Sequence, residues 1–151
     1  MAALKKTDVI TAFERGNCFD AYSFLGSHRT SFRGKAGIVF RVWAPHAKSV
    51  NVVGDFNQWD ESQHPMKRLA DSGIWEVFVP GVPCYSAYKY LVVRQNGTPT
   101  LKSDPYARHF ETAPANASKI WWPEEDFSWG DAAWLQQRAK KNPYQSAMNI
   151  Y

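Results

Sequence analysis

The sequence predicts an all-β protein, an antiparallel β-sandwich of roughly seven to eight strands with a short N-terminal helical segment and one C-terminal helix. Three observations support this fold class. Apolar and polar residues alternate with a period of two in several segments, which is typical of half-buried strands. These segments recur about every ten residues and end at glycine or proline. Between them, no segment has the helical pattern of roughly 10–15 residues that parallel βαβ units require.

The N-terminal region predicts helical structure followed by a loop. Residues 7–16 begin with a Thr-Asp pair, carry apolar residues at helical spacing and end in glycine, so they predict a short N-capped helix. The compact, aromatic segment 17–27 predicts one further helical turn. The polar segment 28–35 predicts a loop that leads into the sandwich.

The predicted strands share the alternating pattern and are bounded by turn residues. They cover residues 36–43, 50–53, 66–69, 74–79, 87–94, 98–102 and 118–122. Between the fifth and the sixth of these strands, Asn96-Gly97 is a strong signal for a hairpin turn. The strands therefore follow one another closely enough to form an antiparallel sandwich.

The sequence changes character after residue 123. Residues 131–141 begin with an acid and end in lysines, which suits a helix dipole, so they predict a helix that Asn142-Pro143 stops. An acidic segment at 124–126 precedes this helix, and the apolar, strand-like tail 148–151 follows it. Such a tail suggests a piece of a longer protein.

The composition excludes several classes of protein. The net charge is +4, but the basic residues are scattered, which favours a solvated surface over a nucleic-acid stripe. No segment approaches the roughly 18 apolar residues of a membrane span, and residues 1–10 lack a signal-peptide core. We therefore expect a cytoplasmic protein without membrane contact, in which Cys18 and Cys84 are free thiols.

No catalytic apparatus is evident in the sequence. It contains no Gly-x-Ser-x-Gly elbow, Walker loop, dinucleotide fingerprint or His-Glu-x-x-His motif. The four histidines have no metal-ligand spacing, so we expect neither a metal nor a cofactor. A glycosidase needs two carboxylates across a cleft, and Asp55, Asp60 and Glu61 lie together in one local loop.

The loop after the second predicted strand is the candidate binding feature. Gly54 can take backbone angles closed to other residues, so the strand can end abruptly there. Asp55 and Asn57 are expected to bond to nearby backbone and tighten the turn, while Phe56 points into the core. Trp59 either stands at the surface as a flat platform for a sugar or folds back as a lid on the core, and its spacing leaves both interpretations open.

Seven ordered motifs carry a resemblance to a known family. They are GIVFRVWAPHAKSV at 37–50, VGDFNQW at 53–59, HPM at 64–66, GIWE at 73–76, YKY at 88–90, KSDPYA at 102–107 and NIY at 149–151. From about residue 19 to residue 151, the chain resembles the bacterial 1,4-α-glucan (glycogen) branching enzymes. In that family this region is the N-terminal family-48 carbohydrate-binding module, an immunoglobulin-like β-sandwich, ahead of a (β/α)8 catalytic barrel.

The resemblance implies a domain organisation and a set of partners. Residues 1–35 would be an N-terminal helical extension and loop, 36–123 the carbohydrate-binding sandwich, and 124–151 a linker helix with the start of the barrel. The catalytic carboxylates would lie beyond residue 151, so this chain alone would not be an enzyme. The parent protein would transfer α-1,4-glucan segments to form α-1,6 branches, and the partners would be α-glucans (glycogen, maltooligosaccharides) and the protein's own barrel.

The resemblance also implies the glycan-binding residues. In the related glycogen-binding module of AMP-activated protein kinase, a tryptophan that matches Trp59 and a lysine that matches Lys89 hold the α-glucan. A second stacking tryptophan of that module falls on Leu101, and a hydrogen-bonding asparagine falls near Ser118, so both of these contacts are changed. Together with Asn57 of the loop, these are the candidate glycan-binding residues. The resemblance favours the platform interpretation of Trp59.

An alternative function is a structural docking domain that supports the barrel and has little glycan affinity. The loss of an aromatic residue at Leu101 motivates it, as do the tryptophans near the barrel junction, Trp121, Trp122, Trp129 and Trp134. We favour local packing of the last strand and helix as the interpretation of these rings over a sugar platform. A regulatory interaction module of the kinase type and a nucleic-acid-binding protein are further alternatives.

Overall fold

The computed structural model describes residues 6–122, 128–145 and 147. Its elements, in chain order, are α1 (Lys6–Glu14), η1 (Ala21–Ser23), β1 (Gly26–Phe32), β2 (Lys35–Trp43), β3 (Ala47–Gly54), η2 (Asp55–Asn57), β4 (Lys67–Arg68), β5 (Ile74–Pro80), β6 (Ala87–Arg94), β7 (Pro99–Lys102), β8 (His109–Phe110), β9 (Ser118–Lys119), α2 (Ala132–Lys140) and η3 (Pro143–Gln145). The acidic segment 124–126 and the tail 148–151 lie outside the described residues.

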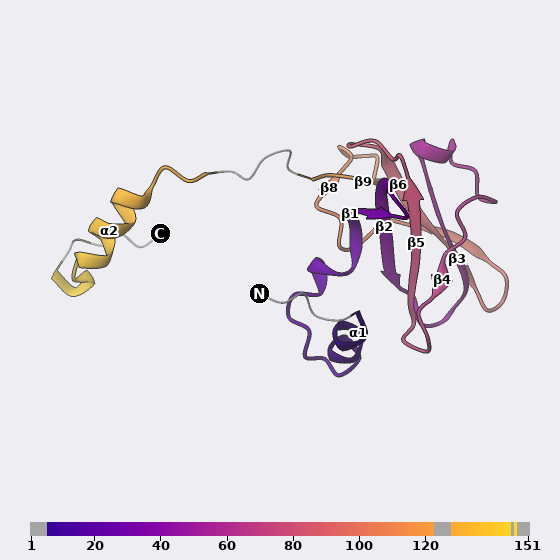
Figure 1. Cartoon of the computed structure of the whole chain (residues 1–151), viewed down its shortest axis with the longest axis horizontal. Helices are drawn as coiled ribbons and strands as arrows, with labels where there is room; N and C mark the ends of the chain where they lie inside the picture. Colours follow the sequence, from indigo (N-terminus) through magenta and orange to yellow (C-terminus); the bar gives the residue numbers. More distant parts are fainter. Residues whose placement is uncertain (1–5, 123–127, 146, 148–151) are drawn as a thin grey trace.

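Two antiparallel sheets form the body of the molecule (Figure 1). One has the strand order β1-β2-β5-β4 and the other the order β3-β6-β9-β8, with β7 also paired to β6. The predicted all-β sandwich is therefore confirmed, as are the N-terminal helix, the helical turn at η1 and the C-terminal helix. Cys18 and Cys84 are free thiols, as expected.

The core lies between the two sheets, and the alternation in the sequence defines it. Phe40 of β2, Val52 of β3, and Tyr88 and Tyr90 of β6 are all fully buried and belong to one apolar cluster. Burial of an apolar side chain such as that of Phe40 or Val52 stabilises the fold by about 1.5–3 kcal/mol. Because side chains alternate across a strand, Lys89, between the two tyrosines, must lie on the opposite, outer face of its sheet.

A buried carboxylate fixes the segment after β7 to this core. Asp104 is fully buried, and its Oδ2 accepts hydrogen bonds from the hydroxyls of Tyr88 (2.7 Å) and Tyr90 (3.0 Å). Its backbone N–H donates to the hydroxyl of Ser118 at 2.8 Å. Burial raises the pKa of Asp104, and the hydrogen bond from Tyr88 opposes that rise. All four side chains thus belong to one satisfied polar network inside the sandwich.

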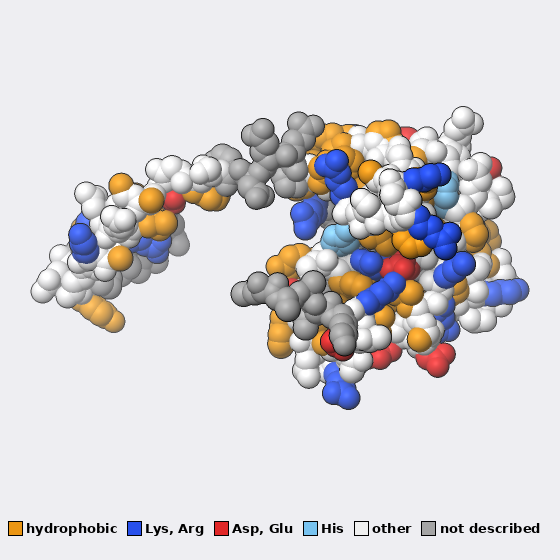
Figure 2. Space-filling model, in the orientation of Figure 1, with side chains coloured by type: hydrophobic (Ala, Val, Ile, Leu, Met, Phe, Trp, Pro, Cys, Tyr) orange, Lys and Arg blue, Asp and Glu red, His pale blue; other side chains and the backbone are white. Residues whose placement is uncertain are grey.

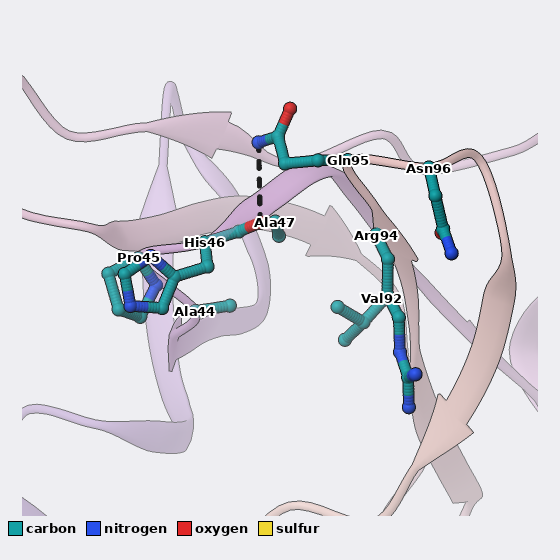
Figure 3. Close-up of a pocket in the computed structure, with 8 residues that line it drawn as sticks. All are labelled: Ala44, Pro45, His46, Ala47, Val92, Arg94, Gln95 and Asn96. Carbon is teal, nitrogen blue, oxygen red and sulfur yellow. Dashed lines mark hydrogen bonds between the residues drawn. The ribbon is translucent and has the colours of Figure 1, made fainter.

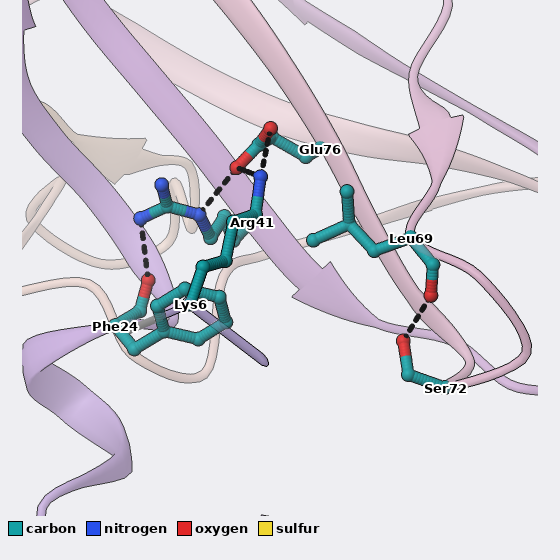
Figure 4. Close-up of polar contacts among 6 residues, drawn as sticks. All are labelled: Lys6, Phe24, Arg41, Leu69, Ser72 and Glu76. Carbon is teal, nitrogen blue, oxygen red and sulfur yellow. Dashed lines mark hydrogen bonds and ion pairs between the residues drawn. The ribbon is translucent and has the colours of Figure 1, made fainter. Parts of the chain in front are cut away.

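Helix α1 packs at one end of the strands (Figure 1). The Nζ of Lys6 lies 2.6 Å from Oε1 of Glu76, a residue of β5 (Figure 4). The same carboxylate accepts a hydrogen bond from the Nε of Arg41 at 2.6 Å, and the Arg41 guanidinium lies 4.3 Å over the ring of Phe24. Phe13 of α1 also meets Trp43 of β2 edge-to-face. The helix is therefore part of the folded body.

The prediction of a loop at residues 28–35 is wrong. These residues form most of β1, which pairs with β2 from Gly26↔Arg41 to Phe32↔Lys35, and the turn between the two strands. β1 lies at the edge of its sheet, and only Gly26 of this strand is buried. Because its other side chains are not buried, its sequence is polar and lacks the apolar alternation of a central strand. The strand expected at 118–122 is shorter in the structure, where β9 covers Ser118–Lys119. The sequence pattern predicts no strand at the two-residue β8.

Basic side chains do not form a single patch on the surface in view. Figure 2 shows lysine and arginine interspersed with apolar and acidic side chains on this face. Among the residues that the structure describes, no helix is long and apolar enough to span a membrane.

Candidate functional site

The loop after β3 begins at a glycine that close packing requires. Gly54 has an extended backbone (φ 177°), which any residue adopts, so the expected reason for this glycine is wrong. A Cβ at this position would lie 2.3 Å from the carbonyl oxygen of Ala87 and 2.8 Å from the ring of Phe56. Gly54 thus allows the loop to lie directly against the start of β6. Phe56 packs on the core, as predicted.

Asn57 holds the loop in shape from the inside. Asn57 is 5% exposed, and its side-chain oxygen Oδ1 accepts a hydrogen bond from the backbone N–H of Gly54 at 2.9 Å. Its side-chain nitrogen Nδ2 donates to the backbone carbonyl of Val52 (3.2 Å) and lies 3.1 Å from Nδ1 of His64. Burial lowers the pKa of His64, which favours the neutral ring that can accept this bond. Asn57 therefore tightens the turn, as predicted, and its amide is occupied there.

Trp59 is presented at the surface in a fixed orientation. It is 37% exposed, and its indole N–H donates to Oδ1 of Asp55 at 3.1 Å. The other carboxylate oxygen, Oδ2, accepts the backbone N–H of Ala87 at 2.7 Å, so Asp55 links the ring to β6. Gln58 and Trp59 both have positive φ values, 55° and 61°, which non-glycine residues adopt only when their surroundings hold them.

Lys89 and Leu101 lie on the same side of the sheet that contains β6, facing away from the core. Lys89 pairs with Val53, the residue before the loop, and its Nζ donates to Oδ1 of Asn116 at 2.5 Å. Leu101 of β7 pairs with Leu91, two residues along β6 from Lys89, and is 44% exposed. We call outer face the surface formed by Lys89, Leu101 and Asn116 on the outer side of the β3-β6-β9-β8 sheet, together with Trp59, which Asp55 links to the start of β6.

Ser118 is not part of the outer face. It is fully buried, pairs with Tyr88 and accepts the N–H of Asp104, so it faces the core. Asn116, two residues earlier, is exposed and holds Lys89. Sequence reasoning missed Asn116, and the only signal for it was an asparagine just before the last strand. The hydroxyl of Ser103 donates to the carbonyl of Asn116, which ties this residue to the β7 side of the sheet.

The carboxylates of the loop build turns. Asp60 accepts hydrogen bonds from the hydroxyl and backbone N–H of Ser62 and from the side-chain amide of Gln63. The bond from the Ser62 hydroxyl, above all, lowers the pKa of Asp60, whereas a general acid needs a raised pKa. Among the described residues, no group of three or more His, Cys, Asp or Glu side chains could hold a metal ion.

A pocket of about 560 Å³ lies at the other end of β3 and β6 from the loop (Figure 3). Ala44, Pro45, Ala47 and Val92 give it an apolar floor, and its other lining residues are His46, Arg94, Gln95 and Asn96. Gln95 closes one side by donating to the carbonyl of His46 at 3.3 Å. The lining contains no tryptophan, tyrosine or phenylalanine on which a sugar could stack. The outer face, unlike the described lining of this pocket, therefore offers an exposed aromatic ring.

Comparisons with known proteins identify the family to which the sequence is similar. Residues 24–107 match the family model described as carbohydrate-binding module 48 (isoamylase N-terminal domain). The 1,4-alpha-glucan branching enzyme GlgB of Nitrosospira multiformis is 47% identical over 141 residues, which cover 92% of this chain and 19% of that protein. The protein of the same name from Bacillus subtilis is 42% identical, with 92% and 22% covered. The chain thus spans about a fifth of the length of these curated relatives.

Solved structures show the same architecture. Ligand-free PulA from Klebsiella pneumoniae is 27% identical, with a TM-score of 0.52, over 66% of this chain and 10% of that one. The pullulanase from Bacillus acidopullulyticus is 29% identical, with a TM-score of 0.51, over 69% of this chain and 13% of that one. The likeness again covers a small part of each larger protein.

Proposed function

Since the chain belongs to the carbohydrate-binding module 48 family, we propose that its outer face contacts α-1,4-glucans such as glycogen and maltooligosaccharides. In this proposal the chain is a non-catalytic N-terminal module of a glycogen branching enzyme. One observation carries it: the exposed ring of Trp59 is fixed beside the strand that bears Lys89.

The chemistry of the outer face suits a sugar chain. An aromatic ring stacks on the apolar face of a pyranose, and the Trp59 ring is available for such a contact, whereas its N–H is already bonded to Asp55. Lys89 has three donors, of which one is bonded to Asn116, so further donors can reach sugar hydroxyls. Leu101 would add apolar area and no aromatic face.

The names of the relatives support α-glucan as the class of ligand. The curated relatives described above are 1,4-α-glucan branching enzymes. A Klebsiella pneumoniae pullulanase of similar fold was solved in complex with maltotriose. We propose accordingly that the parent protein transfers α-1,4-glucan segments to form α-1,6 branches and that a catalytic barrel is the partner of this module. A cytoplasmic location stays a prediction.

The division of the chain into domains is also a proposal. The segments 1–35, 36–123 and 124–151 would be the N-terminal extension, the sandwich, and the linker with the start of the barrel. Because β1 pairs with β2 along its whole length, we now place the start of the sandwich at Gly26. The matched family model begins close by, at residue 24.

Affinity electrophoresis in gels that contain glycogen tests the proposed function. We expect the chain to be retarded, and we expect Trp59→Ala to weaken glucan binding by about 1–3 kcal/mol, the cost of truncating an aromatic anchor. Trp134→Ala is the matched control, because Trp134 is 56% exposed and lies on α2, away from the sandwich in sequence. Absence of retardation of the wild type, or equal retardation of Trp59→Ala, would refute the proposal.

A docking role toward the rest of the protein is the second candidate function. None of the nine residues of α2 is buried, and Trp134 and Leu135 are exposed on it. Such a face suits a further protein surface. A full-length enzyme that keeps its activity and thermal stability after deletion of residues 1–145 would contradict this role.

A further inference from the structure

Tyr85 is an exposed aromatic residue in a rarely adopted backbone conformation. It is 53% exposed and has a φ of 64°, in the left-handed region that bulky residues avoid. Trp59 shares this combination of an exposed ring and a positive φ. Such conformations persist only where the surroundings enforce them, and they gather at functional sites.

The surroundings of Tyr85 hold its ring in place. Its N–H donates to the carbonyl of Ile120 at 2.7 Å, which fixes the backbone just before β6. Its ring meets the imidazole of His109 edge-to-face, with the ring centres 5.4 Å apart and the planes at 77°. An aromatic side chain braced in this way offers its exposed surface to a ligand with little further loss of entropy.

The register of the strands places Tyr85 on the outer face. Ala87 of β6, Lys119 of β9 and His109 of β8 pair in one row across the sheet. Ala87 is two residues from Lys89, so this row lies on the same side of the sheet as Lys89. Because Tyr85 contacts His109, its ring lies on this side as well. Asp55, which holds the Trp59 indole, is bonded to the N–H of Ala87, between Tyr85 and Lys89 in the chain.

We propose that Tyr85, braced by His109, is a second aromatic contact for the α-glucan chain. It would replace the stacking ring that Leu101 cannot supply. The two rings would lie under different sugar units of the same chain, so Tyr85 would make the affinity depend on the length of the glucan. This inference rests on the proposed function.

Two oligosaccharides of different length test the inference by isothermal titration calorimetry. We expect wild-type protein to bind maltoheptaose more tightly than maltotriose. Tyr85→Gly removes the ring and suits a positive φ, so it should fold and should lower the affinity for maltoheptaose at least fivefold, about 1 kcal/mol. Its affinity for maltotriose should change less than twofold, because Trp59 remains. Tyr85→Asn, which also tolerates this conformation, should behave in the same way.

Two controls separate the ring from the fold. Tyr85→Phe keeps the ring and should bind maltoheptaose as the wild type does, whereas Tyr144→Ala, at a residue that is 96% exposed on η3, should have no effect. If Tyr85→Gly and Tyr85→Asn bind maltoheptaose like the wild type while Trp59→Ala does not, the inference is wrong and the proposed function stands. If the wild type binds neither oligosaccharide, both are wrong.

Discussion

Replacement of Gly54 by alanine should destabilise the sandwich and disorder the Trp59 loop. The added Cβ would lie 2.3 Å from the carbonyl oxygen of Ala87, about 1 Å short of ordinary van der Waals contact, and 3.1 Å from the Cα of Tyr88. Backbone atoms cannot turn aside as a flexible side chain can, so β3 and β6 must separate. Overpacking of a tight interior costs about 1–3 kcal/mol, and this contact belongs at the upper end of that range.

Urea and thermal denaturation followed by tryptophan fluorescence measure this cost. For a protein of this size, a loss of about 2–3 kcal/mol lowers the melting temperature by about 4–12 °C. Gly130→Ala is the matched control, because a Cβ added at Gly130 would meet no atom within 4 Å and the residue has no positive φ. A free energy of unfolding of Gly54→Ala within about 0.5 kcal/mol of the wild-type value would refute a packing constraint at Gly54.

Two further predictions concern polar contacts. Asp55→Ala removes the acceptor of both Trp59 and Ala87, so we expect glucan affinity to fall toward that of Trp59→Ala, with a smaller loss of stability of about 1–2 kcal/mol; unchanged calorimetric affinity would contradict this. Burial alone would raise the pKa of Glu76, but hydrogen bonds from Lys6 and Arg41 outweigh it and lower that pKa below 4.5. The carboxylate therefore stabilises the fold above pH 4.5, and this contribution is lost as the pH falls through the lowered pKa. Glu76→Gln should lower the urea midpoint at pH 7 and flatten its decline between pH 5 and pH 3, and a decline as steep as that of the wild type would exclude this account.

The sequence predicts the central strands well because their side chains alternate between core and surface. Phe40, Tyr88 and Tyr90 all lie where the period of two expects them. The same reasoning fails for β1, because an edge strand is held by its backbone pairing with β2, and its exposed side chains carry no apolar signal.

The candidate site is predicted only in part, because its membership depends on register. Asp55 links Trp59 to Ala87 of β6, two residues from Lys89, and a joint contact of the two side chains with a glucan stays a prediction. The sequence cannot show that Ser118 pairs with Tyr88 and faces inward while Asn116 reaches Lys89. Nor does any local signal indicate that Tyr85, a residue type that avoids positive φ, adopts 64°. Side-chain direction at these positions follows from pairing between distant segments.

The two ends of strand β6 differ in how much change of sequence they should tolerate. Its first residues receive the Asp55 bond, carry Lys89 and adjoin Tyr85, whereas its far end leads into the turn at Asn96-Gly97. A Cβ added at Gly97 would meet no atom within 4 Å, so the tip of this turn has room for added residues. New chain termini, or an inserted fluorescent reporter, could therefore be introduced at that hairpin while the opposite end of the same strand keeps its geometry.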